Sequence, residues 1–519
     1  MKAERVSENV ASAINGRLIA RNALISLIGQ VVPRLVGLAA IPFIVRELGI
    51  GRYGIFSVGL VVLGYFGFFD LGFGLATTKY VAEYQRKGDE NKICEVVWSS
   101  LAAQLLFGTF GGLALASVTP LLVSHLLHIP PPLTAEAERT LFLLAASLPV
   151  VLCASTLQGA LGAGQRFDLV NAVQIPLHAS TFLIPAAGFA LGLGLPQVVV
   201  VLLLVRLAAA LFSLTFCFRV YPSLRHRLSF APQSLRLLAR CGSWVTVTNL
   251  VQPAFLYLDR FLIGALLSIT AVAYYSAPLQ LASSLAIFPA SLLATLFPTF
   301  SAASARNDLE ALEKICRGAF KALLLIEGPL VLLAVRWAPQ ILRLSLGEDF
   351  AAQSTFSFQT LAIGMLLFSL AYVPFNLLQA AGRPDLPAKF CLLELPIYAA
   401  GLWFLVGRMG IGGAALAWTL RAGLDAMLLA RACSVLKLVP LDAVARNGCW
   451  RSLAMFVVLA MIISPVPLVA GSILRQGIVA GLGMCLFAVV VWRYGLDSND
   501  KGFLGAVFRR LATNSTRWS

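Results

Sequence analysis

The sequence predicts an all-α, polytopic membrane protein. Of its 519 residues, 59% are hydrophobic and only 12% are charged, and its mean hydropathy is +0.85. A soluble chain carries about 25% charged residues, so a water-soluble fold of this length would leave too much apolar surface in water. Apolar stretches of about 20 residues, the length a helix needs to cross the hydrocarbon core, recur along almost the whole chain. The bilayer is therefore the expected solvent.

Apolar runs interrupted by charges or by proline and glycine clusters predict about fourteen transmembrane helices. These runs are too long for membrane strands and lack alternation in steps of two, which excludes a closed β-barrel. The first run is longer than the core of a secretory signal, so we expect this helix to be retained. The predicted helices cover residues 18–45, 53–78, 94–124, 139–164, 168–193, 195–219, 241–267, 270–303, 316–340, 355–381, 387–407, 411–435, 451–472 and 474–494.

The basic residues set the expected orientation of these helices. The chain holds 40 Lys and Arg against 24 Asp and Glu, a formal net charge of +16. They gather in alternate loops, mostly on the side that carries the N-terminus, and such loops are cytoplasmic. We therefore expect both termini in the cytoplasm, and the charge needs no nucleic-acid partner.

The chain is predicted to hold two related six-helix lobes. A shift of 219 residues lays Ile44–Leu60 on Ile263–Leu279, so the junction of helices one and two is similar to that of helices seven and eight. The arginine-rich stretch between the lobes either attracts anionic lipid or phosphorylated headgroups, or only marks topology. The predicted domains are an N-terminal lobe at 1–220, a basic cytoplasmic linker at 221–240, a C-terminal lobe at 241–440, and two extra helices with a tail at 441–519.

Several motifs near the N-terminus resemble one transporter family, the polysaccharide or O-antigen flippases of the multidrug/oligosaccharidyl-lipid/polysaccharide exporter superfamily. The resemblance covers about the first 440 residues. The motifs that carry it are Arg21-Asn22, Pro42–Gly49, Tyr53–Ser57, Phe69–Gly74, Thr77–Glu83, Leu346–Phe350 and Gln379–Pro384.

This resemblance implies two lobes of six helices that face a central cavity and work by alternating access. The implied cargo is a polyprenyl-pyrophosphate-linked oligosaccharide, moved from the cytoplasmic to the periplasmic leaflet of a bacterial inner membrane. The implied partners are this lipid-linked saccharide, membrane lipids, a coupling ion that is either H⁺ or Na⁺, and other polysaccharide-assembly proteins. No cofactor is expected.

Charged residues inside the predicted helices are the candidate site residues. A charge at mid-membrane costs about 2.5–3.5 kcal/mol on insertion scales, so such residues usually line a bundle interior or a watery cavity. Arg34 either lines the cavity and binds the pyrophosphate or pairs with a neighbouring acid. Asp70, among glycines, either binds an ion, holds Arg34, or satisfies backbone groups at a helix break.

The remaining embedded charges lie in later helices. Asp259 and Arg260 are adjacent and point about 100° apart, so at least one is expected to face the cavity. Glu327 and Glu394 either carry a coupling ion or compensate for the proline that follows each. Arg421 and Asp425 are four residues apart and predict an intrahelical ion pair. Arg206 has no acid within one turn and must find a partner on another helix or reach an interface.

Missing motifs argue for a transporter rather than an enzyme. There is no GxxxxGK[ST] phosphate loop, no HExxH and no nucleophile elbow, and no outer loop is long enough for a catalytic domain. The nine cysteines lack CxxC spacing and the four histidines are scattered, so no metal site is predicted. The alternatives are an ion-coupled multidrug efflux antiporter, which embedded arginines disfavour, and a membrane glycosyltransferase or polymerase, which the short loops disfavour.

Overall fold

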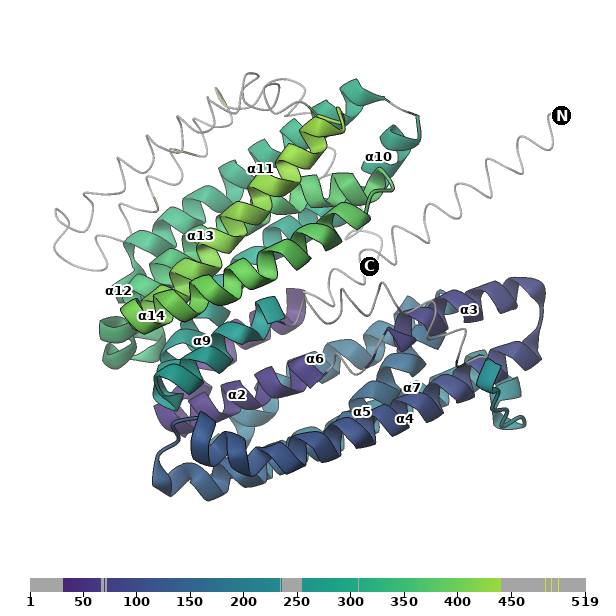
Figure 1. Cartoon of the computed structure of the whole chain (residues 1–519), viewed down its shortest axis with the longest axis horizontal. Coiled ribbons are helices and arrows are strands. Elements are labelled where there is room, and N and C mark those ends of the chain that lie inside the picture. The colour runs from purple at the N-terminus through teal and green to yellow at the C-terminus, as the bar shows by residue number, and fades with distance from the viewer. Residues whose placement is uncertain are drawn as a thin grey trace. The chain divides into compact units, whose positions relative to one another are not determined.

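The computed structural model describes residues 31–66, 70, 72–233, 235, 254–306 and 308–439, with single positions at 481, 487 and 493. Every regular element in this part of the chain is a helix (Figure 1). The start of the first predicted helix, the end of the basic linker, the start of the seventh predicted helix and, apart from the three single positions, the last two predicted helices lie outside the described residues.

The first half of the chain forms long apolar helices that follow the predicted order. Residues 31–48 are helical and lead directly into α2, and residues 254–266 are helical before α9. The labelled helices are α2 (Ile50–Phe66), α3 (Phe73–Lys87), α4 (Glu90–Leu121), α5 (Thr134–Ala163), α6 (Phe167–Ala190), α7 (Leu195–Val220) and α9 (Ile269–Ser283).

The second half continues with five labelled helices. Eight helical segments of the described chain are long and apolar enough to cross a membrane, including α4 to α7, α11, α13 and α14. This confirms the predicted all-α, polytopic membrane fold. The helices are α10 (Ile287–Ala305), α11 (Leu309–Arg336), α12 (Ala338–Leu346), α13 (Glu348–Ala380) and α14 (Asp385–Val435).

Four predicted spans differ in continuity from the helices of the structure. The second is divided where α2 ends at Phe66 and α3 begins at Phe73, and the eighth is divided by a 3-10 turn at Ser284–Ala286. The eleventh and twelfth predicted helices join in α14, whose backbone leaves the helical region only at Gly410. Its φ of 59° lies where only glycine is comfortable, so the two spans connect without a loop.

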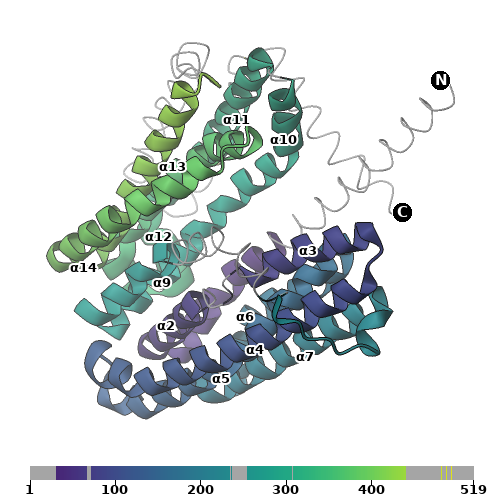
Figure 2. The same ribbon diagram turned by 45° about the vertical axis from the view of Figure 1, so that its right-hand side comes forward.

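The two halves of the chain fall into two compact units, Met1–Leu281 with Leu402–Ala414, and Ala282–Gly401 with Ala415–Ser519. In the first, α5 packs against α3, α4 and α7, which run beside it in Figures 1 and 2. Small residues allow the close approach: a Cβ on Gly159 would lie 2.3 Å from the Gly74 carbonyl oxygen, and one on Gly108 would lie 2.5 Å from the Cα of Pro149.

In the second unit, α13 packs against α10, α11 and α12. A hydrophobic core joins α10, α11, α13 and the second half of α14, with the fully buried Phe300 among its largest side chains. Helix α12 is short and amphipathic, with Leu342 buried and Leu344 exposed. The bilayer-exposed leucines and phenylalanines need no protein partner, because hydrocarbon is as apolar as they are.

Local contacts recur in the two halves at nearly constant spacing. In both halves an aspartate caps a long helix, an arginine pairs with the aspartate two residues on, and a buried cysteine points its thiol at a carbonyl on another helix. The recurring pairs are the caps Asp89 and Asp308, the ion pairs Arg166–Asp168 and Arg383–Asp385, and the thiol contacts Cys217–Leu157 and Cys433–Pro374.

Candidate functional site

Asp70 lies at the break between α2 and α3 and is held by polar groups of three helices. Its carboxylate accepts a hydrogen bond from the side-chain amide of Gln104 on α4, and its backbone carbonyl accepts a second from the same amide at 3.2 Å. Ser155 and the backbone N–H groups of Gly72 and Gly74 also hydrogen-bond this side chain. These contacts satisfy groups freed by the helix break, and Arg34 is not among the described partners of Asp70.

Asp259 and Arg260 lie on residues 254–266 and point in different directions. Asp259 is 1% exposed and accepts a hydrogen bond of 2.7 Å from the hydroxyl of Tyr275 on α9. Its other oxygen accepts the backbone N–H of Arg260 at 2.7 Å. The Arg260 guanidinium lies 6.0 Å from the centre of the Tyr257 ring. Asp259 is thus a buried acid held in place by Tyr275, while Arg260 is half-buried.

Arg34 is half-buried in the helix of residues 31–48. This helix approaches α6 closely, since a Cβ on Gly37 would lie 3.1 Å from the ring of Phe182. Arg34, Asp70, Asp259 and Arg260 all belong to the first compact unit. In the structure the Asp259 side chain hydrogen-bonds the backbone N–H of Arg260. The hydrogen-bond partners of Asp70 are other residues than these three.

Glu327 is fully buried on α11, in the second unit. One carboxylate oxygen accepts a hydrogen bond of 2.7 Å from Ser369 on α13. The other oxygen is buried and has no hydrogen-bond partner among the described residues. A carboxylate buried with a single hydroxyl donor is energetically expensive, so Glu327 is a candidate for binding a proton or a cation.

Glu394 meets Arg421 across the two halves of α14. The Glu394 carboxylate and the Arg421 guanidinium are 3.8 Å apart, and their side chains are 0% and 9% exposed. The guanidinium also lies 5.9 Å from the ring centres of Tyr398 and Trp418. Asp425 interacts electrostatically with both charges. Two acids therefore surround one arginine, an arrangement that the spacing of Arg421 and Asp425 alone did not predict.

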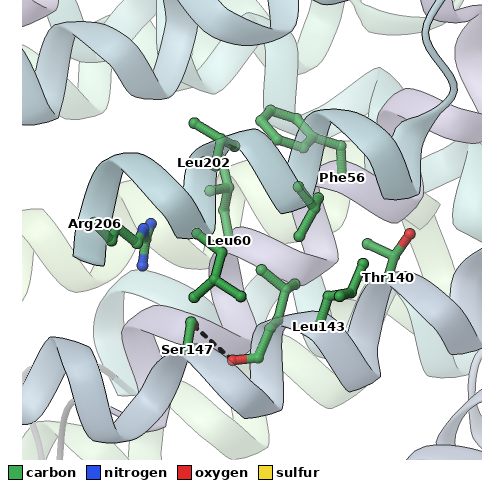
Figure 3. A pocket seen from close by; sticks show the side chains of 10 residues that line it. Phe56, Leu60, Thr140, Leu143, Ser147, Leu202 and Arg206 are labelled. Carbon is green, nitrogen blue, oxygen red and sulfur yellow. Dashed lines mark hydrogen bonds between the residues drawn. The ribbon is translucent and has the colours of Figure 1, made fainter. Parts of the chain in front are cut away.

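A small pocket in the first unit contains the embedded Arg206 (Figure 3). Its walls come from α2, α5 and α7 and are apolar except for Thr140, Ser147 and Arg206. The Ser147 hydroxyl donates to the Leu144 carbonyl at 2.6 Å. The sequence marked Arg206 as embedded but gave it no role, since no acid lies near it in the chain.

Among the described residues, no cluster of His, Cys, Asp and Glu could hold a metal ion. The described cysteines are free thiols, and Cys94, Cys217, Cys316 and Cys433 are buried.

Comparison with known families matches residues 19–304 to the polysaccharide biosynthesis protein family and residues 245–403 to the MatE family. A Shigella flexneri protein named for O-antigen transport is 28% identical over 426 residues, which cover 80% of this chain and 99% of that protein. The membrane protein EpsK of Bacillus subtilis strain 168 is 26% identical over 369 residues, covering 68% of this chain and 70% of EpsK.

Solved structures share the same fold. The inward closed form of the lipid II flippase MurJ superposes with a TM-score of 0.68 at 13% identity, covering 91% of this chain and 99% of that one. An inward-facing MATE-family multidrug transporter gives a TM-score of 0.65 at 16% identity, covering 83% and 99%. Because the first family match spans more than half of the residues, the chain belongs to the polysaccharide biosynthesis protein family.

Proposed function

We propose that this protein flips a polyprenyl-pyrophosphate-linked oligosaccharide from the cytoplasmic to the periplasmic leaflet of a bacterial inner membrane by alternating access. The observation that carries the proposal is the set of arginines embedded in long apolar helices. A pyrophosphate drawn into low-dielectric surroundings needs counter-charge, and arginine stays ionised there and offers a planar fork of donors. The relative named for O-antigen transport supports this cargo class.

In this proposal Arg34 and Arg260 bind the pyrophosphate in the first compact unit. Asp259 fixes the backbone next to Arg260 through its 2.7 Å hydrogen bond, and Tyr275 holds Asp259 in turn. Asp70 stabilises the backbone conformation at the break between α2 and α3. The predicted lobes at 1–220 and 241–440 and the cytoplasmic termini remain part of the proposal.

The second unit is proposed to bind the coupling ion. Glu327 and Glu394 are fully buried carboxyl groups with unsatisfied oxygens. Glu327 changes its protonation or binds a cation at lower cost than it stays charged without a counter-charge, whereas Glu394 has the Arg421 guanidinium 3.8 Å away. Either H⁺ or Na⁺ fits this chemistry.

Substitution of Arg34 tests the proposed cargo contact. We expect Arg34→Lys to impair flipping of a lipid-linked saccharide in proteoliposomes almost as much as Arg34→Ala, because lysine lacks the bidentate fork. The amount of protein in the membrane should stay normal for both. Lower abundance of both variants, or unchanged flipping, would show a structural role. Restored flipping in Arg34→Ala with Asp70→Asn would show that Arg34 only neutralises an acid.

Multidrug efflux is the second candidate, favoured by the MatE match at 245–403. A cavity for organic cations should be acidic and aromatic. Proteoliposomes with an imposed H⁺ or Na⁺ gradient separate the two functions. Uptake of a lipophilic cation without flipping of a lipid-linked saccharide would replace the first proposal with the second.

A further inference from the structure

The segment after α7 is fastened to the end of the first compact unit. Tyr221 is 6% exposed, and its hydroxyl donates a hydrogen bond of 3.2 Å to the carbonyl of Ala160 on α5. Leu224 is 1% exposed, and its carbonyl accepts a hydrogen bond of 3.3 Å from the indole of Trp98 on α4. Residues 221–231, here named the strap, therefore belong to the packed bundle and do not form a loose linker.

The strap lies beside α4 (Figures 1 and 2) and first runs toward the start of this helix, where Arg227 donates a hydrogen bond to the side chain of Asn91. The N–H of Ala231 then donates to the Ser99 hydroxyl at 3.1 Å. Eight residues of helix, roughly 12 Å, separate Asn91 from Ser99. Because Ser99 lies within the predicted membrane span 94–124, the strap returns to the depth at which hydrocarbon begins.

Two large apolar side chains of the strap are exposed. Leu228 is 80% exposed and Phe230 is 58% exposed, whereas Ser229 between them is half-buried. Phe230 adjoins Ala231, about 3.8 Å along the chain, so it lies near the depth of Ser99. Leucine and phenylalanine favour the boundary between headgroups and acyl chains over water. The strap thus presents an apolar surface to the interfacial layer of the bilayer.

Basic side chains flank these two residues in the chain. Arg219, Arg225 and Arg227 are all exposed, and the sequence holds no Asp or Glu between Asp168 and Asp259. An anionic membrane surface attracts each such arginine, which is worth about fivefold in local binding. Topology alone accounts for the arginines, but it does not account for the exposed apolar pair beside them.

We propose that the strap is an anchor for anionic phospholipid, with Leu228 and Phe230 in the interfacial layer and the three arginines at the lipid phosphates. Insertion of apolar side chains together with attraction of charge is the combination that binds surface segments to anionic membranes. The inference is independent of the cargo, because it concerns resident lipid at the bilayer surface. Since α4 and α5 hold the strap, the lipid contact fixes the depth of the first compact unit in the bilayer.

The test measures how closely lipid approaches Phe230 in the full-length chain. Phe230→Cys and, as the matched control, Glu90→Cys are labelled with the fluorophore NBD and placed in phosphatidylcholine nanodiscs. Glu90 is exposed at the start of α4, roughly 14 Å from Ser99 along the helix. The quenchers are phosphatidylglycerol and phosphatidylcholine that carry a nitroxide high on one acyl chain. The unsubstituted chain, treated identically, gives the labelling background.

Nitroxide lipid should quench the label at 230 and leave the label at 90 nearly unquenched. Half-maximal quenching at 230 should need an about fivefold lower mole fraction of phosphatidylglycerol than of phosphatidylcholine, because only the former is anionic. Arg219→Gln with Arg225→Gln should remove most of this preference and leaves the hydrogen bond of Arg227 in place. Arg139→Gln, which removes an exposed cation of α5, should keep the preference.

Three outcomes would overturn the proposal. The first is equal quenching at 230 and 90, and the second is half-maximal quenching at 230 at equal mole fractions of the two lipids. The third is a label at 230 that is shielded from both nitroxide lipid and aqueous iodide, which would show that another part of the protein covers this surface. The labelled chains must unfold at the wild-type temperature. If Phe230→Cys lowers it, Leu228→Cys takes its place with the same expectations.

Discussion

The two fully buried glutamates differ in what they contact. Glu327 has a hydroxyl donor on one oxygen and no arginine, so Glu327→Gln keeps the Ser369 hydrogen bond and removes only the capacity to bind an ion. We expect the variant to fold normally and to lose gradient-driven flipping. The comparison is Glu310→Gln, an exposed position in the first turn of the same helix. Gradient-dependent flipping at wild-type rate in Glu327→Gln would remove Glu327 from the coupling proposal.

Glu394 has Arg421 beside it, and this pair makes a different prediction. Removing one member of a buried ion pair leaves the other uncompensated and costs about 3–5 kcal/mol. Arg421→Gln should therefore lower the unfolding temperature strongly, and Glu394→Gln in the same chain should restore much of it. Thermal unfolding of the two single variants and the double variant measures the coupling. Purely additive effects would show that the two charges do not act as a pair.

At the level of single residues, the sequence identified which side chains are embedded but not what they touch. Asp70 among glycines predicted a helix break, and its role in satisfying freed groups was one stated alternative. The contact of Asp259 with Tyr275 and that of Glu394 with Arg421 depend on how helices are rotated about their axes. Such rotations follow from packing across helices, which hydropathy along one chain does not contain.

Helices of the first unit depend on close approaches at glycine. Gly159 on α5 has no room for a side chain, since its Cβ would lie 2.3 Å from the carbonyl oxygen of Gly74. Gly162, one turn later, would meet nothing within 4 Å. We expect Gly159→Ala to destabilise the protein by about 1–3 kcal/mol through overpacking. Gly162→Ala should be neutral or stabilising by about 0.5–1 kcal/mol, because alanine favours the helix.

Thermal unfolding in one detergent compares these two variants directly. Equal unfolding temperatures for Gly159→Ala and Gly162→Ala would contradict the tight crossing of α3 and α5. The same pair in a flipping assay tells whether this crossing must also move during transport.

At the scale of single elements, the sequence predicted that the helices exist, but it predicted only some of the points at which they are interrupted. Runs of apolar residues fix the number of crossings because each must span the same hydrocarbon thickness. The 3-10 turn at Ser284–Ala286 contains no glycine and no charged residue. The hydropathy pattern therefore predicted one continuous helix through this turn. The sequence predicted a loop near residue 408, between the eleventh and twelfth helices. In the structure α14 continues through this point, and only Gly410 leaves the helical conformation, with a positive φ.

Across the whole molecule the two halves share local contacts but differ in embedded charge. The first compact unit carries Arg34, Arg206 and Arg260 together with Asp70 and Asp259, while the second carries Glu327, Glu394 and Asp425 together with Arg421. Under the proposed function the first half binds the anionic cargo and the second binds the coupling cation.

Topology is the property of the whole molecule on which every functional proposal depends. Basic loops predict that residues 225–236 and 306–314 are cytoplasmic and that residues 130–137 are external. Single cysteines at His226, Glu310 and Pro132, all exposed, place a thiol in each segment. A membrane-impermeant maleimide should label only the cysteine at 132 in whole cells and all three after permeabilisation, with the unsubstituted chain as the background. Labelling at 226 in intact cells would invert the orientation, because every helix is linked in series, and cargo would then have to be loaded from the opposite leaflet.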